Sequence, residues 1–272
     1  MISVAPRSFS ITTKSSLQCM QARFCIALLG FAAIASSAFP QSKTSLTISA
    51  AASLKEALVE VEAAYKQSQP NLEFSNNFAA SGTLAAQIDQ GAPVDVFLSA
   101  AAKQMDVLES KGLLVAGSRR NLLRNTLVLI APLDSKLGDF KDLTGDNVKV
   151  IALGDPAGVP AGQYGRQTLL ALHLFDKVSS KVVFAKDVRQ VLTYVETGNA
   201  DAGLVYGTDA KSSSKVRVVA TAPESSHDAI LYPAAVVKAS RDQAGAHKFI
   251  DFLGGPAAAS IFVKHGFTIA TP

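Results

Sequence analysis

The chain has 272 residues, of which 48% are hydrophobic and 18% charged. This length allows one large or two modest domains, since domains typically run to about 100–200 residues. The composition supports a hydrophobic core and excludes general disorder.

The first 38 residues have the pattern of a secretory signal peptide. Residues 20–23, Met-Gln-Ala-Arg, form a short basic lead, residues 24–34 are apolar, and Ser-Ser-Ala at 36–38 is a cleavage site of the A-x-A type. The apolar run is shorter than the about 20 residues that span a bilayer. We therefore expect residues 1–38 to be removed during export to the periplasm, with Met20 as a candidate for the true start.

Removal of this segment changes the charge and the thiol content. Arg7, Lys14 and Arg23 leave with it, so 23 basic residues face 22 acidic ones and the net charge falls from +4 to +1. This small value argues against a nucleic-acid partner. Both cysteines, Cys19 and Cys25, also leave, which excludes a cysteine nucleophile, a thiolate metal site and a lipid-attachment cysteine after the apolar run. We expect a soluble protein.

From residue 45 onward, short apolar runs alternate with helical patterns. Residues 46–50 are strand-like, and 54–67 carry apolar side chains at spacings of three and four, which indicates an amphipathic helix. The same alternation predicts strands at 72–77 and 94–98 and helices from 81 and over 101–110. Strands that alternate with helices on this scale predict βαβ units and a largely parallel sheet.

A second alternation follows, and the carboxyl end closes with two helices. It predicts strands at 127–130, 148–153, 181–184, 202–206, 216–220 and 229–237, and helices at about 160–174, 188–196, 243–252 and 256–264. Because the tail is too short for a domain of its own, we expect it to return to the first lobe. The prediction is lobe 1 from 45–122 and 222–272, and lobe 2 from 123–221, with hinges near 121–126 and 218–224.

Ligands in open α/β sheets bind outside the carboxyl ends of strands, where helices begin. Ser53 and Ser81 each follow a predicted strand and open a predicted helix. Their hydroxyls and the neighbouring amides favour an anion. Helix capping alone is an equally good interpretation of either serine taken singly.

Three later turns have similar but weaker signals. Pro160-Ala161-Gly162 opens a helix, with proline at the first turn and a glycine that allows close backbone approach. Val188 follows Asp187, which is placed to cap the next helix. Tyr206 ends a strand and could present its hydroxyl to a cleft, although most such tyrosines pack in cores.

The sequence gives little support to an enzyme. The histidines, at 173, 227, 247 and 265, lack metal-ligand spacing, and there is no G-x-S-x-G elbow, P-loop or G-x-G-x-x-G. His227 lies beside Ser225 and Ser226, but a triad is a spatial arrangement that sequence does not reveal. We therefore expect no catalysis and no cofactor.

Taken together, the motifs resemble those of the molybdate-binding proteins of bacterial ABC transporters. The resemblance extends from about Leu46 to Phe267, in ordered blocks. They are Ala-Ala-Ala-Ser-Leu at 50–54, Phe-Ala-Ala-Ser-Gly-Thr-Leu-Ala at 78–85, Gly-Ala-Pro-Val-Asp-Val-Phe at 91–97, Gly-Asp-Pro at 154–156 with Val-Pro-Ala-Gly at 159–162, Asp-Val-Arg at 187–189, Val-Tyr-Gly-Thr-Asp at 205–209 and Gly-Phe at 266–267.

This resemblance implies a type II periplasmic-binding-protein fold of two lobes, each a mixed, mainly parallel sheet flanked by helices, with molybdate or tungstate in the interlobe cleft. By block matching, the ligand-binding residues are Ser53, Ser81, Ala161, Val188 and Tyr206. Ser53 and Ser81 would supply hydroxyls and amides, Ala161 and Val188 amides alone, and Tyr206 its hydroxyl. Ala80 stands where the family often has serine. The metal would be bound only as the oxyanion, without direct metal ligands.

The resemblance further implies a monomer that delivers its anion to the membrane permease of an ABC importer. Three alternatives stay open. The nearest is a protein of the same fold for sulfate, phosphate or another oxyanion. The others are the ligand-sensing domain of a transcription regulator and an exported hydrolase.

Overall fold

A computed structural model describes residues 44–270. These belong to one compact unit, Gln41–Pro272. The predicted signal peptide, the candidate start at Met20 and both cysteines lie outside the described residues.

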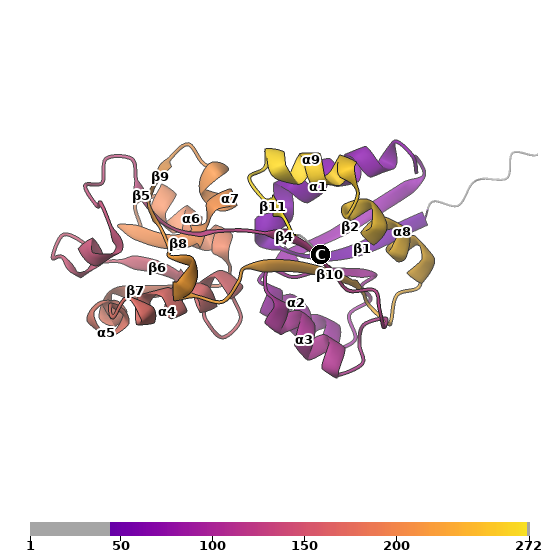
Figure 1. Cartoon of the computed structure of the whole chain (residues 1–272), viewed down its shortest axis with the longest axis horizontal. Coiled ribbons are helices and arrows are strands. Elements are labelled where there is room, and N and C mark those ends of the chain that lie inside the picture. The colour runs from indigo at the N-terminus through magenta and orange to yellow at the C-terminus, as the bar shows by residue number, and fades with distance from the viewer. Residues whose placement is uncertain (1–43, 271–272) are drawn as a thin grey trace, which may run out of the picture. The chain divides into compact units, whose positions relative to one another are not determined.

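The described chain alternates strands and helices (Figure 1). The strands are β1 (Thr44–Ala51), β2 (Leu72–Ala79), β3 (Val96–Leu98), β4 (Arg120–Arg124), β5 (Leu127–Pro132), β6 (Ile151–Gly154), β7 (Val182–Ala185), β8 (Ala202–Tyr206), β9 (Val216–Thr221), β10 (Leu231–Val236) and β11 (Thr268–Ile269). The helices are α1 (Lys55–Lys66), α2 (Ser81–Asp89), α3 (Ala102–Ser110), α4 (Pro160–Ala171), α5 (Phe175–Val178), α6 (Val188–Glu196), α7 (Gly207–Lys211), α8 (Gln243–Leu253) and α9 (Pro256–Lys264).

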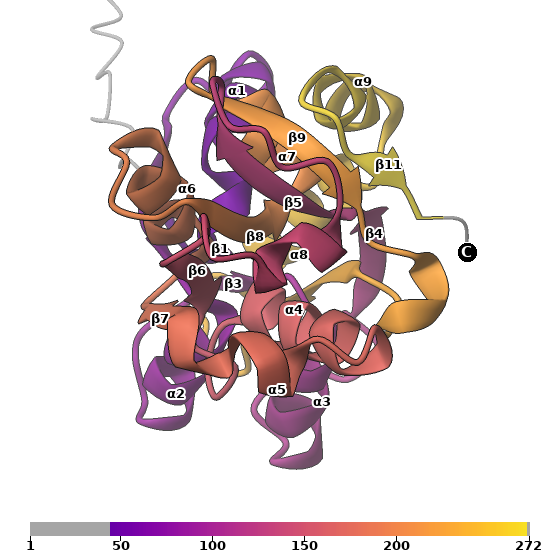
Figure 2. The same cartoon turned by 90° about the vertical axis from the view of Figure 1, so that its left-hand side faces the viewer.

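The first sheet, which defines lobe 1, has six strands in the order β11-β4-β10-β3-β1-β2. β1 pairs in parallel with β2 and β3, whereas β10 and β11 pair antiparallel with their neighbours. Helices α2 and α3 lie on one side of this sheet, and α1, α8 and α9 lie on the other (Figures 1 and 2). Tyr65 of α1 packs edge-on against Phe249 of α8, with ring centroids 5.2 Å apart. This contact joins the two helices through the core.

The second sheet, which defines lobe 2, has five strands in the order β7-β6-β8-β5-β9. β6 pairs in parallel with β7 and β8, and β5 pairs antiparallel with β8 and β9. Figures 1 and 2 show α4 and α5 on one face and α6 and α7 on the other. The β6–α4 and β8–α7 turns therefore lie at the carboxyl ends of neighbouring strands.

The chain passes between the sheets twice. Sheet membership changes between Arg124 at the end of β4 and Leu127 at the start of β5, and again between Thr221 and Leu231. The predicted boundary after residue 122 falls inside β4, and the one after residue 221 falls at the end of β9.

The two-lobed fold with mixed sheets is confirmed. The sheets are less parallel than predicted, because β4, β5, β9 and β10 flank the passages between lobes and make the antiparallel pairings. Strands β4 and β11 and helices α5 and α7 were not predicted. The sequence of β4 is Arg-Asn-Leu-Leu-Arg, and with a charged residue at each end it lacks the apolar run that indicates a strand.

Candidate functional site

A small cavity lies where helices of both lobes begin. Ser53, Ser81, Ala161, Val188 and Tyr206, the predicted ligand-binding residues, all line it. The remaining lining residues are Ala51, Ala52, Ala79, Ala80, Ala100, Val159, Pro160 and Asp187. The structure thus brings together five residues spread from position 53 to position 206 of the sequence. That these residues donate hydrogen bonds to a ligand remains a prediction.

Ser53 is placed differently from the sequence expectation. It lies inside a 3₁₀ turn, Ala52–Leu54, and α1 begins only at Lys55 with Leu54 at its N-cap and no side-chain cap. The predicted capping role of Ser53 is therefore wrong, because a three-residue 3₁₀ turn separates the end of β1 from the start of α1. Its buried hydroxyl instead lies 2.9 Å from the Tyr232 hydroxyl of β10.

Ser81 is the first residue of α2, and Ala80 occupies the N-cap position without a side-chain hydrogen bond. Its hydroxyl oxygen is fully buried and accepts a hydrogen bond from the Ala100 amide at 2.9 Å. Ser81 Oγ therefore keeps its own proton for a second partner. The Ser81 side chain is fixed in direction by the loop that follows β3.

Ala161 and Val188 could offer a ligand only their backbone amides. They occupy the first turns of α4 and α6, where a helix offers no carbonyl to the amides. Within residues 44–270, neither amide donates to any other protein group. Asp187 caps α6, as predicted, by accepting from the Gln190 amide at 2.9 Å. Two amides without a partner among the described residues thus belong to residues that line the cavity from lobe 2.

The backbone must pass close behind the Ala161 amide. A Cβ atom at Gly162 would lie 1.9 Å from the Gly154 carbonyl oxygen, which no side chain tolerates. Glycine at this position lets α4 begin directly against the end of β6. The predicted close approach at Gly162 is therefore present, and it is made to the neighbouring strand.

Tyr206 ends β8 and is almost fully buried. Its ring meets Tyr232 edge-on with centroids 5.8 Å apart, and its hydroxyl lies 3.5 Å from the Ala100 carbonyl of lobe 1. Burial raises the pKa of Tyr206 well above its ordinary value, and neighbouring Tyr232, Tyr164 and Asp209 raise it further. Tyr206 therefore remains a neutral hydrogen-bond donor at any physiological pH.

Among the described residues 44–270, no lysine or arginine lines the cavity. Asp187, a charged residue that does line it, is engaged in capping α6. Arg189 directly follows Val188 in the sequence, and its guanidinium contacts Glu56, Asp209 and Ser212. An anion at this site would be held by neutral amides and hydroxyls, each of which is worth about 1.5–3 kcal/mol when its partner is charged.

The volume of the cavity limits what enters it in this conformation. It encloses about 10 Å³, roughly the space of one water-sized sphere. A tetrahedral oxyanion is larger than water, so the walls must separate to admit one. Because the walls come from both lobes, a small relative movement of the lobes enlarges the cavity.

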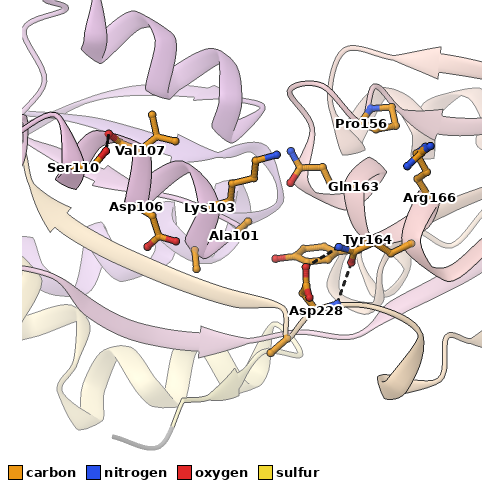
Figure 3. A pocket seen from close by; sticks show the side chains of 13 residues that line it. Ala101, Lys103, Asp106, Val107, Ser110, Pro156, Gln163, Tyr164, Arg166 and Asp228 are labelled. Atoms are coloured by element: carbon orange, nitrogen blue, oxygen red, sulfur yellow. Dashed lines mark hydrogen bonds between the residues drawn. The ribbon is translucent and has the colours of Figure 1, made fainter. Parts of the chain in front are cut away.

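A much larger groove, about 770 Å³, lies between α3 and α4 (Figure 3). Figure 3 shows Lys103 extending from α3 toward Gln163 of α4, with Asp228 beside Tyr164. Asp228 accepts a hydrogen bond from the Gln167 side chain at 2.6 Å. Size alone does not make this groove the better candidate. Within residues 44–270, all five predicted donors line the small cavity and none of them lines the groove.

Sequence reasoning missed two residues behind the cavity, Tyr232 and Asn125. The Asn125 side-chain amide donates to the Tyr232 hydroxyl at 3.2 Å and to Thr208 Oγ1 at 2.9 Å. Neither residue lies in a turn that follows a strand of a βα unit. Only the pairing of β10 with β4 brings Tyr232 beside the passage between lobes, and no local pattern signals that pairing.

Other kinds of site find little support in the described chain. No cluster of three or more His, Cys, Asp or Glu side chains within residues 44–270 could hold a metal ion. None of the helices in this range is both long and apolar enough to cross a bilayer.

Comparison with known proteins identifies the family. Residues 46–268 match the family described as bacterial extracellular solute-binding protein. The chain belongs to this family. The family is one of solute-binding proteins rather than enzymes, and the match covers both lobes.

Relatives of the bacterial extracellular solute-binding family include named transport proteins. The chain is 40% identical over 248 residues to the molybdate-binding protein ModA of Haemophilus influenzae, covering 89% of this chain and 94% of that protein. It is 43% identical over 235 residues to the putative ABC transporter substrate-binding lipoprotein YvgL of Bacillus subtilis, covering 86% and 90%.

Solved structures of the family agree with the fold. The substrate-binding domain of a putative molybdenum ABC transporter from Clostridium difficile is 46% identical, with a TM-score of 0.67 over 84% of this chain and 100% of that one. The periplasmic molybdate-binding protein of Azotobacter vinelandii is 26% identical, with a TM-score of 0.75 over 83% and 100%.

Proposed function

We propose that this chain captures molybdate, and the similar tetrahedral anion tungstate, and delivers it to an ABC importer. The observation that carries the proposal is the convergence of Ser53, Ser81, Ala161, Val188 and Tyr206 on one small cavity. The molybdate-binding relatives support the choice of anion, since they are 40% identical over nearly their full length.

Binding without a cation gives the site its selectivity. The ligand would exchange its hydration shell for the Ala161 and Val188 amides and for the hydroxyls of Ser53, Ser81 and Tyr206. Fixed neutral donors bind most tightly an anion whose oxygens lie within hydrogen-bond distance of all of them. A smaller tetrahedral anion such as sulfate would leave some donors unpaired, at a cost of about 1–3 kcal/mol for each buried group.

Capture requires the lobes to close around the anion. Donors come from lobe 1 at Ser53 and Ser81 and from lobe 2 at Ala161, Val188 and Tyr206, so only a closed form engages them all. Hinge motion would occur in the passages between β4 and β5 and between β9 and β10. The closed form would be recognised by the membrane permease of the importer.

Location and assembly belong to the same proposal. The chain would act in the periplasm after removal of residues 1–38, as a monomer, with no cofactor and no catalysis. Mass spectrometry of the exported protein tests the removal, and light scattering tests the monomer.

Isothermal titration of the mature chain with molybdate, tungstate, sulfate and phosphate tests the ligand. The expected result is tight one-to-one binding of molybdate and tungstate, with no heat from sulfate or phosphate. Tight binding of sulfate or phosphate instead would assign the chain to another oxyanion. Silence toward all four would refute capture of molybdate and tungstate and would move the search to other oxyanions.

A further inference from the structure

The Ser53 hydroxyl is one end of a chain of hydrogen bonds that begins in the passage between the lobes. Ser53 Oγ lies 2.9 Å from the Tyr232 hydroxyl, and that hydroxyl lies 3.2 Å from the Asn125 side-chain nitrogen. Ser53 and Tyr232 are almost fully buried. The chain therefore joins the cavity to a residue between β4 and β5.

Asn125 sets the direction of the hydrogen bonds. Its side-chain oxygen accepts from the Thr126 amide at 2.9 Å, so its nitrogen must face Tyr232 and Thr208. An amide nitrogen only donates. The Tyr232 oxygen therefore accepts from Asn125 and retains its own proton.

The proton of Tyr232 then decides the role of Ser53. A serine hydroxyl has one proton and accepts through its lone pairs. If Tyr232 donates to Ser53 Oγ, the Ser53 proton is free to point into the cavity. If Ser53 donated to Tyr232 instead, its lone pairs would face the cavity and would repel an anion.

We propose that Tyr232, held by Asn125, is a positioning residue that orients the Ser53 hydroxyl as a donor to the bound oxyanion. This inference rests on the proposed function, because it concerns the same ligand. Hydrogen bonds aligned in series polarise one another, so the outermost hydroxyl becomes a stronger donor. The arrangement also explains how a site without a cation fixes a rotatable hydroxyl.

The same asparagine connects the arrangement to both lobes. Asn125 donates to Thr208 of α7 in lobe 2 and to Tyr232 of β10 in lobe 1. Thr208 lies two residues after Tyr206, a predicted donor from lobe 2. The orientation of Ser53 is therefore coupled to the contact between the lobes.

A double-mutant cycle on molybdate affinity tests the proposal. The proteins are the unchanged chain, Tyr232→Phe, Ser53→Ala and the double variant. Loss of one orienting hydrogen bond should weaken binding by about three- to tenfold in Tyr232→Phe. In the Ser53→Ala background the same change should alter the affinity by less than about twofold, because the oriented group is gone.

Tyr65→Phe is the matched control, since it removes a hydroxyl from another buried tyrosine of lobe 1 that packs against Phe249 and Phe252. It should leave the affinity unchanged. Asn125→Ala is a second route to the same effect and should weaken binding more in the Ser53 background than in the Ser53→Ala background, where only its contact with Thr208 is lost.

The outcomes separate this inference from the function on which it rests. Equal losses from Tyr232→Phe in both backgrounds would show a general structural role and overturn the inference. So would unchanged affinity in both Tyr232→Phe and Asn125→Ala. Failure of the unchanged chain to bind molybdate or tungstate would instead refute the proposed function and the inference with it.

Discussion

Arg189 forms an ion pair with Asp209 at 2.8 Å, and the same guanidinium contacts Glu56 of the other lobe. Asp209 is completely buried, whereas the side chain of Glu56 is 46% exposed. The arginine therefore neutralises a buried carboxylate in lobe 2 while it holds lobe 1. Burial raises the pKa of Asp209 to about 6, and Arg189 acts in the opposite direction.

Arg189→Met should destabilise the protein by about 3–5 kcal/mol at pH 7.5, because it leaves a buried carboxylate unpaired. The pKa of Asp209 in the folded state lies above its ordinary value, so folding favours the protonated form. The loss of unfolding free energy caused by Arg189→Met should therefore be smaller at pH 5, where Asp209 is protonated. Urea unfolding at both pH values measures the difference.

Arg119→Met is the control for this change. Arg119 also contacts two carboxylates, Asp106 and Glu109, but their side chains are 59% and 50% exposed. Its removal should cost about 0–1 kcal/mol. Equal losses from the two arginine variants would contradict the importance of burial.

Val188→Pro should weaken molybdate binding by about 1.5–3 kcal/mol, since it removes the amide that we propose as a donor to a charged ligand. Proline suits the first helical position, and the preceding Asp187 is already extended, with φ −158° and ψ 172°. Val188→Ala keeps the amide but loses buried apolar atoms. It should lower the melting temperature and preserve the affinity, the reverse of the proline variant.

Gly82→Ala should weaken molybdate binding by separating the lobes. The Gly82 amide donates to the Gly158 carbonyl across the cleft at 2.9 Å, and a Cβ at Gly82 would lie 2.5 Å from that oxygen. Overpacking of this kind costs about 1–3 kcal/mol. A Cβ at Gly158 would meet nothing within 4 Å, so Gly158→Ala should bind normally in the same titration.

Glu62 should make stability depend on pH. Burial raises its pKa, although the Asn76 amide donates to Glu62 Oε2 at 2.8 Å and lowers it in part. A raised pKa in the folded state means that the stabilisation is complete below the ordinary pKa and is lost as pH rises through the folded value.

Glu62→Gln should remove the part of the pH dependence of stability that comes from the titration of Glu62. In the described structure Glu62 Oε1 and Asn76 Oδ1 are both buried without a partner, and a glutamine nitrogen could satisfy the asparagine oxygen. Thermal unfolding between pH 4 and pH 8 compares the two chains. Parallel profiles would show that Glu62 does not titrate in this range.

Local signals predicted much of the fold. Asp187 before an apolar period placed α6 at its observed first residue, and Pro256 did the same for α9. The turn at Ser53 was harder, because a 3₁₀ turn and an α-helix begin with the same small and hydroxyl residues. β4 was missed because its pairing with β10 is a property of the assembled sheet.

The residues of the candidate site also fall into those that local sequence signals predicted and those that they did not. Each predicted donor lies at the end of a strand or in the first helical turn after one, so its place follows from the order of elements. Tyr232, Asn125 and the contact of Arg189 with Glu56 depend on residues more than 100 positions apart. Hydrophobic periodicity and capping signals do not extend over such separations.

The use of main-chain amides at Ala161 and Val188 affects how the protein tolerates mutation. A side-chain replacement at either position changes packing, but every residue except proline still has the N–H group. The ligand preference is thus encoded in the path of the backbone, and a new specificity would need a shift of the α4 or α6 start rather than a change of side chain.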